Sequence, residues 1–303
     1  MSCQQRLARE YEQLRQAQFD SARKSAAPGQ WQALVGKYRR ALRDHADLET
    51  SRGLARALWR WSMALTAAGN AAGAVEAGRQ AASEFDSVFR KTLDWDADER
   101  SPAVDEALAE LLVARTDLAE ILAEAGGLDE RIRVLEEARE AGHSVEAGPR
   151  TRRALGTVHH NLSIAEMTRL LDAVRRRGGA DPMVPTLSAS RAVEIRQGLI
   201  DPLDPLTLWE LANTYIQYLR CLGMVEEPDR AVMVLDLAAK LVAMMPAGTP
   251  ADLRPQLDQT VNMLCTAYPG HARQFAKAYP GGGTGRRSPR FGFRRSRRRP
   301  PYG

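Results

Sequence analysis

Few residues of this chain have side chains and spacings that suit catalysis or metal binding. His159 and His160 are its one adjacent histidine pair. On a helix, adjacent side chains point about 100° apart, so this pair does not converge on one metal ion. A zinc site on a helix needs histidines four residues apart, often with a glutamate between them. The pair therefore predicts helix packing or a polar surface.

Other reactive side chains also favour a structural interpretation. Cys221 lies between Leu219 and Leu222 in an apolar helical pattern, and neither a base nor a cause for a lowered thiol pKa is visible beside it. The chain has no phosphate-binding GxxxxGK[ST] loop and no GxGxxG after a strand pattern. We therefore expect no enzyme activity and no cofactor.

The C-terminal segment carries most of the positive charge. The net charge of the chain is +5, but residues 281–303 hold eight arginines and no acidic residue, which leaves the first 280 residues at −3. These arginines are Arg286, Arg287, Arg290, Arg294, Arg295, Arg297, Arg298 and Arg299. We predict a disordered tail over 279–303.

Aromatic residues lie among the tail arginines, at Phe291, Phe293 and Tyr302. Phosphate neutralisation by arginine and base stacking on aromatic rings are the two needs of a flexible nucleic-acid-binding segment. Acidic lipid headgroups or an acidic protein would attract the same residues. A solvated tail without function, or an out-of-frame end of a GC-rich gene, would also have this composition.

The rest of the composition indicates helices. Aromatic residues make up 6% of the 303 residues, and Ala, Leu, Arg and Glu are abundant. No apolar run approaches the roughly 20 residues of a membrane-spanning helix, and the polar start of the chain shows no signal peptide. Three scattered cysteines do not suit a disulfide framework, so we expect a cytoplasmic protein.

The helical pattern is repetitive. Residues 54–85 read as two helices around Gly69-Asn70, and such a pair cannot bury its apolar faces without stacked neighbours. The predicted helical-repeat domain, residues 1–278, has pairs at about 2–48, 50–91, 103–141, 149–199 and 204–245, and a closing helix at about 253–277.

Apolar and small residues recur at matching places in these pairs. The opening pair has Trp61-Ser62, Leu65, Gly69, Ala74 and Ala81, and the next has Leu118-Ala119, Leu122, Gly126 and Ala138. This pattern resembles the tetratricopeptide repeat (TPR). The second-helix alanines at 41, 81, 138, 192 and 238 are 40, 57, 54 and 46 residues apart, whereas the usual repeat is about 34 residues. The chain is thus most similar to divergent long-helix arrays of bacterial signalling proteins.

The resemblance implies an all-α fold, a right-handed α-solenoid of stacked antiparallel helix pairs. It also implies a scaffold or regulatory module that holds a peptide or protein partner in its concave groove. Asn213 stands where peptide-clamping members carry an asparagine, and Trp209 lies one turn earlier. The alternatives are nucleic-acid association through the arginine tail, and a sensor or regulatory fragment of a larger signalling NTPase or protease system.

Overall fold

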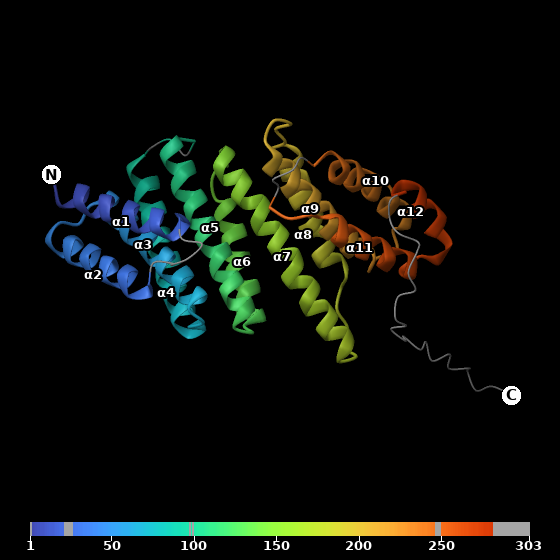
Figure 1. Cartoon of the computed structure of the whole chain (residues 1–303), viewed down its shortest axis with the longest axis horizontal. Coiled ribbons are helices and arrows are strands. Elements are labelled where there is room, and N and C mark those ends of the chain that lie inside the picture. The colour runs from blue at the N-terminus through green and yellow to red at the C-terminus, as the bar shows by residue number, and fades with distance from the viewer. Residues whose placement is uncertain (1, 21–26, 97, 99, 246–249, 281–303) are drawn as a thin grey trace.

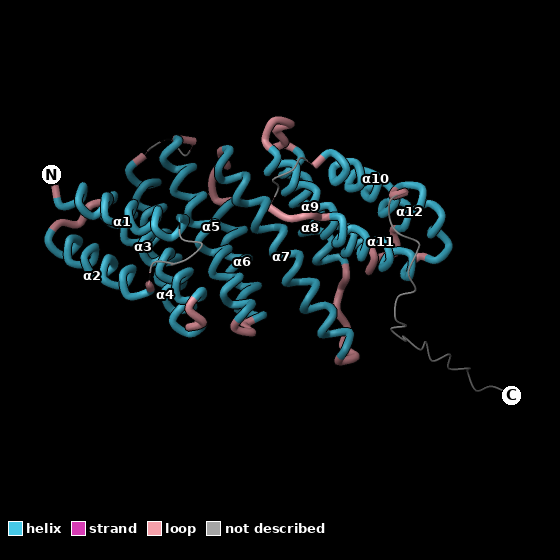
Figure 2. The backbone as a smooth tube through the Cα atoms, viewed as in Figure 1, coloured by secondary structure: helices cyan, strands magenta, loops and turns pink. Residues whose placement is uncertain are grey.

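The structure is a computed structural model that describes residues 2–20, 27–96, 98, 100–245 and 250–280. Every regular element in these ranges is a helix, and short loops connect them (Figure 2). The helices pair as α1 (Cys3–Asp20) with α2 (Pro28–Asp44), α3 (Leu48–Ala67) with α4 (Ala71–Trp95), α5 (Pro102–Glu124) with α6 (Leu128–Gly142), α7 (Pro149–Arg175) with α8 (Met183–Gln197), and α9 (Pro205–Leu222) with α10 (Pro228–Met244). The last elements are α11 (Arg254–Ala267), the 3-10 turn η1 (Pro269–His271) and α12 (Ala272–Ala278).

The helices stack in chain order into an elongated array (Figure 1). Each helix packs on the next one along the chain, and the first helices α5 and α7 also pack on each other. The prediction of an all-α solenoid of helix pairs is confirmed. The tail residues 281–303 lie outside the described residues.

Small residues allow the helices to approach closely. The second-helix alanines at 81, 138, 192 and 238 are all at most 1% exposed. A β-carbon at Gly78 of α4 would lie 3.0 Å from Leu118 of α5. Large apolar side chains, among them Leu108, Leu111 and Leu135, fill the remaining space between the helices. The recurring small residues therefore mark the contacts between neighbouring helices.

Side-chain caps mark the starts of α4 and α5. The Ser101 hydroxyl accepts a hydrogen bond from the Val104 amide at 3.2 Å, and Pro102 occupies the first turn, where no amide hydrogen is needed. Asn70 caps α4 in the same way, through the Gly73 amide at 3.0 Å. These caps satisfy amide groups that the helix itself leaves without partners.

Three first helices end in the same backbone motif. The residue after the cap has a positive φ in each: Gly69 (74°) after α3, Gly126 (79°) after α5 and Arg177 (58°) after α7. In each motif the following amide donates back to a carbonyl five residues earlier, as from Gly178 to Ala173 at 2.8 Å. Arginine thus occupies a position that glycine occupies in the two preceding pairs.

The prediction of one closing helix over 253–277 is wrong. The chain leaves the helix at Tyr268, and η1 separates α11 from α12. Pro269 explains the break, because proline has no amide hydrogen to donate and its ring clashes with the preceding turn. At the other end of the array, α1 ends at Asp20, and residues 21–26, which belong to the predicted pair 2–48, lie outside the described residues.

Candidate functional site

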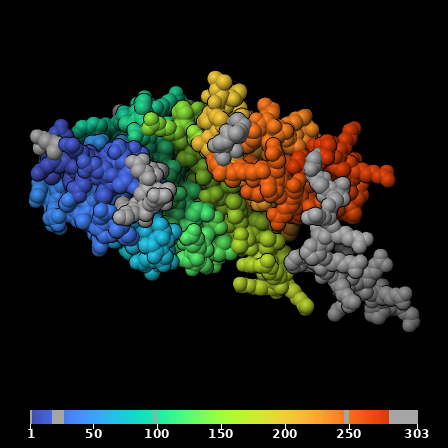
Figure 3. All heavy atoms as spheres, in the orientation of Figure 1, coloured from blue at the N-terminus to red at the C-terminus, as the bar shows by residue number. Residues whose placement is uncertain are grey.

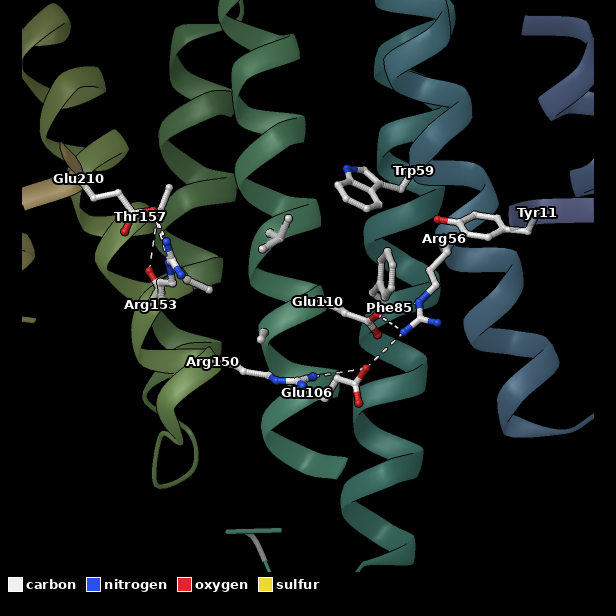
Figure 4. A pocket seen from close by; sticks show the side chains of 13 residues that line it. Tyr11, Arg56, Trp59, Phe85, Glu106, Glu110, Arg150, Arg153, Thr157 and Glu210 are labelled. Atoms are coloured by element: carbon white, nitrogen blue, oxygen red, sulfur yellow. Dashed lines mark hydrogen bonds and ion pairs between the residues drawn. The ribbon is translucent and has the colours of Figure 1, made fainter. Parts of the chain in front are cut away.

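A pocket of about 500 Å³ lies on the face formed by α3, α5, α7 and α9, which we call the first-helix face (Figure 4). Its wall residues come from all four of these helices, and Phe85 of α4 and Tyr11 of α1 complete it. The stacking of helix pairs thus brings together side chains that are far apart in the sequence.

Opposite charges alternate across this face. Arg56 of α3 lies 2.5 Å from Glu110 of α5 and 3.4 Å from Glu106, and Arg52 lies 2.6 Å from Glu110. Arg150 of α7 approaches Glu106 from the other side at 3.5 Å. Burial alone would lower the pKa of Arg56, but the Glu110 carboxylate beside it raises that pKa above its ordinary value.

The alternation continues to α9. The Arg153 guanidinium of α7 lies 3.2 Å from the Glu210 carboxylate. The order along the face is therefore arginine on α3, glutamate on α5, arginine on α7 and glutamate on α9. We call this row the charge ladder; its residues are Arg52, Arg56, Glu106, Glu110, Arg150, Arg153 and Glu210. Partly exposed ion pairs add little stability, so the main effect of the ladder is to give the face a defined pattern of charge.

The pocket has an apolar floor beside the ladder. Phe85 is 1% exposed, while Val113 of α5 is 39% exposed. Trp59 is half-buried, and its indole nitrogen donates to the Asp117 carboxylate at 2.8 Å, which fixes the ring. Tyr11 borders the other side, and its ring lies edge-on to Trp31 at 5.6 Å. Fixed aromatic side chains next to apolar surface can receive an apolar group from a ligand.

The two residues predicted to bind a partner lie on α9, outside the pocket lining. Asn213 is half-buried, and its amide nitrogen lies 3.4 Å from His160 Nε2. Trp209 is also half-buried and donates to the Ala251 carbonyl at 3.0 Å, so its indole N–H already has a partner within the chain. The α9 residue that lines the pocket is Glu210. The predicted tail arginines 286–299 lie outside the described residues.

A buried polar cluster fixes α7, α8 and α9 to one another. Arg196 of α8 donates to the Glu210 carbonyl at 2.8 Å and to the Thr157 hydroxyl at 3.2 Å, and it also contacts Thr214. Burial lowers the pKa of Arg196 to about 10. The cluster holds the backbone of Glu210 and the side chain of Thr157, which both belong to the pocket wall.

The histidine pair is part of the core. His159 is 5% and His160 7% exposed. Burial lowers the pKa of His159 to about 4 and that of His160 to about 3, so both rings are neutral at pH 7. Within the described ranges, no group of three or more His, Cys, Asp or Glu side chains is arranged to hold a metal ion.

Cys221 is fully buried, as its apolar neighbours predict. Burial raises the pKa of its thiol to about 12, and the Gln217 amide donates to its sulfur at 3.7 Å. The thiol is therefore protonated at neutral pH. None of the helices in the described part of the chain is long and apolar enough to span a bilayer.

Sequence reasoning missed the charge ladder. Arg52 and Arg56 are spaced by four residues, and so are Glu106 and Glu110. Each pair therefore presents its charges on one helix face. That spacing could have indicated a charged face on each helix. The ion-pair partner of each residue, however, depends on how α3, α4 and α5 stack.

Together these features define a solenoid of helix pairs with a ligand-sized pocket on one face, and solved structures of TPR-like repeats are among those similar to it. BtubC (BKLC) from P. vanneervenii is 16% identical, with a TM-score of 0.47 over 82% of this chain and 92% of that chain. TPR-like repeats from Podosopora anserina, named for kinesin light chain, are 17% identical, with a TM-score of 0.47 over 75% of this chain and 91% of that chain.

A second structure of the Podosopora anserina repeats is 15% identical, with a TM-score of 0.44 over 75% of this chain and 93% of that chain. No protein-family model and no curated protein matches the sequence.

Proposed function

We propose that this protein is a non-enzymatic interaction module that binds a peptide or protein segment on its first-helix face. The pocket beside the charge ladder is the observation that supports this function. It combines an apolar floor with fixed charges of both signs, which are the two features of a site that binds and orients a polypeptide.

The ligand in this proposal is an extended segment with one apolar anchor side chain. The anchor contacts Trp59 and Val113, which line the pocket together with the buried Phe85. Buried aromatic and apolar anchors provide most of the binding energy at protein interfaces. The charge ladder sets the direction and register of the segment, because a misplaced charge would oppose a like charge.

Arg150 and Arg153 are the ladder residues that we expect to change partners. Their side chains are 66% and 42% exposed, and their ion pairs are among the longer ones on this face, at 3.5 and 3.2 Å. An exposed ion pair is worth about 1 kcal/mol or less, so exchanging it costs little. Acidic residues beside the anchor of the ligand would then pair with these arginines.

Selection of peptides from a random library on the full chain, followed by calorimetry, tests the proposal. Val113→Glu places a charge on the pocket floor, and Trp59→Ala removes one wall. We expect either change to weaken the selected peptides at least tenfold, while Arg133→Glu on α6, 63% exposed and outside the pocket, leaves their affinity unchanged. Equal affinity for wild type and Val113→Glu would show that the peptides bind elsewhere.

The two other functional hypotheses depend on the sequence alone. Nucleic-acid association involves residues 281–303, and the regulatory-fragment hypothesis concerns domains that would lie outside this chain. Both stay predictions, and neither requires the pocket. A partner in the groove and a polyanion on the tail are also compatible with each other.

A further inference from the structure

The far end of the α7–α8 hairpin projects from the array (Figures 1 and 3). The cause is helix length, since α7 has 27 residues while its neighbours α6 and α8 have 15 each and α9 has 18. We call residues 169–191 the hairpin tip. It lies at the end of α7 opposite to Arg150 and Arg153, so it is separate from the pocket.

Apolar side chains on this projection are exposed. Five of them are 38–62% exposed: Leu171, Val174, Met183, Val184 and Leu187. Their spacing of three or four residues within each helix places Leu171 with Val174, and Met183 with Leu187, on one side of its helix. A cluster of exposed apolar side chains on a projecting element indicates a contact surface.

The hairpin tip is also basic. It contains five arginines and two aspartates, a net charge of +3. Arg175 pairs with Asp172 at 3.1 Å, whereas Arg176 and Arg177 form no ion pair with any residue that the structure describes. Both guanidinium groups are therefore available to an anionic partner. The charge ladder differs in this respect, because its arginines are already paired.

The backbone at the tip is strained. Arg177 has a φ of 58°, at the position where Gly69 and Gly126 end α3 and α5. A left-handed conformation is costly for any residue with a β-carbon, and strain of this kind tends to persist where function requires a particular residue. The chain thus keeps a third consecutive arginine at a position that favours glycine.

We infer that the hairpin tip docks on an anionic lipid membrane surface. Its charge is complementary to acidic headgroups, and its apolar side chains are placed to enter the interface between headgroups and acyl chains. The tip is a projection (Figure 3), and a projection meets a flat bilayer more readily than it encloses an extended peptide. This inference does not depend on the proposed peptide-binding function.

The test has to separate the tip from the arginine tail. We would use the full-length chain with the eight tail arginines changed to glutamine, and measure sedimentation with phosphatidylcholine vesicles with and without 30% phosphatidylserine. We expect binding only to the vesicles with phosphatidylserine, and a steep loss of binding with added salt. Each arginine at an anionic surface contributes about a fivefold change in binding.

Two independent changes test the basic residues and the apolar residues of the hairpin tip separately. We expect Arg176→Glu with Arg177→Glu, and separately Leu187→Asp, to weaken vesicle binding at least tenfold. All three residues are exposed, so the fold should be retained, and circular dichroism checks this. Met233→Asp on α10 is the matched control, since Met233 is a 70% exposed apolar residue on another part of the chain.

Three outcomes would overturn the inference. The first is failure of the tail-neutralised chain to bind vesicles containing phosphatidylserine. The second is an equal loss of vesicle binding in Met233→Asp, which would show that binding does not depend on the hairpin tip in particular. The third is binding of soluble polyglutamate, but not of vesicles, through Arg176 and Arg177, which would indicate an acidic protein as the partner.

Discussion

Replacing Arg177 by glycine should stabilise the protein. Arg177 has the left-handed backbone that Gly69 and Gly126 adopt at the ends of α3 and α5. This conformation costs a residue with a β-carbon about 1–2 kcal/mol. Glycine makes the unfolded chain more flexible, which offsets about 0.5–1 kcal/mol of that gain. The expected increase in the free energy of unfolding is therefore about 0.5–1 kcal/mol.

The opposite substitution provides the control. A β-carbon added at Gly126 would meet no atom within 4 Å, so Gly126→Ala changes the backbone energy with no steric clash. We expect that variant to lose about 1 kcal/mol. Urea unfolding followed by far-ultraviolet circular dichroism at fixed pH measures both variants. A loss of stability in Arg177→Gly, alongside the expected loss in Gly126→Ala, would refute the reasoning and show that the arginine side chain compensates for its strain.

Three further predictions concern buried groups and the tail. Burial raises the pKa of Glu166 to about 7 from 4.5. The stability that the protonated carboxyl of Glu166 contributes is therefore fully present below pH 4.5 and is lost as the pH rises to about 7. In Glu166→Gln, the urea midpoints of unfolding at pH 5 and pH 8 should differ less than they do in wild type. Burial lowers the pKa of His160 to about 3 from 6.5, so the folded protein keeps this imidazole neutral while the unfolded chain can protonate it. The protein should therefore lose stability as the pH falls below 6.5. The variant His160→Gln should lose less stability than wild type when unfolding is measured across acid pH. If the tail binds nucleic acid, a chain ending at residue 280 should lose the salt-dependent binding of nucleic acid in filter-binding or fluorescence-anisotropy assays. Binding equal to that of the full chain would refute the tail hypothesis.

The helix pairs could be predicted because local chemistry determines them. Apolar residues at helical spacing marked the helices, and Gly69 and Gly126 marked two of the turns, where the structure finds positive φ angles. The third such turn was not predictable in the same way. The sequence there offers Gly178 and Gly179, yet the left-handed residue is Arg177, because α7 ends earlier than the glycines would indicate.

The pocket was harder to predict because it depends on contacts between distant residues. Arg56 and Glu110 are separated by 54 positions, and Arg153 and Glu210 by 57. A family pattern marked Asn213, but the structure places its amide against His160 in the buried part of the α7–α9 contact. Repeats of unequal length shift the register between neighbours, so a role assigned by pattern does not fix where the side chain points.

The helix α7 contributes to both proposed surfaces, and its length makes them independent. Arg153 lines the pocket near the start of α7, and Arg175 lies near its end. At 1.5 Å per residue these positions are about 33 Å apart along the helix axis. Charges at that distance are screened at physiological salt, and changes so far apart usually have additive effects. We therefore expect Val113→Glu to weaken peptide binding at least tenfold without changing vesicle binding, and Leu187→Asp to weaken vesicle binding at least tenfold without changing peptide binding. A loss of both activities in either variant, with an unchanged circular dichroism spectrum, would show that the two surfaces are one site.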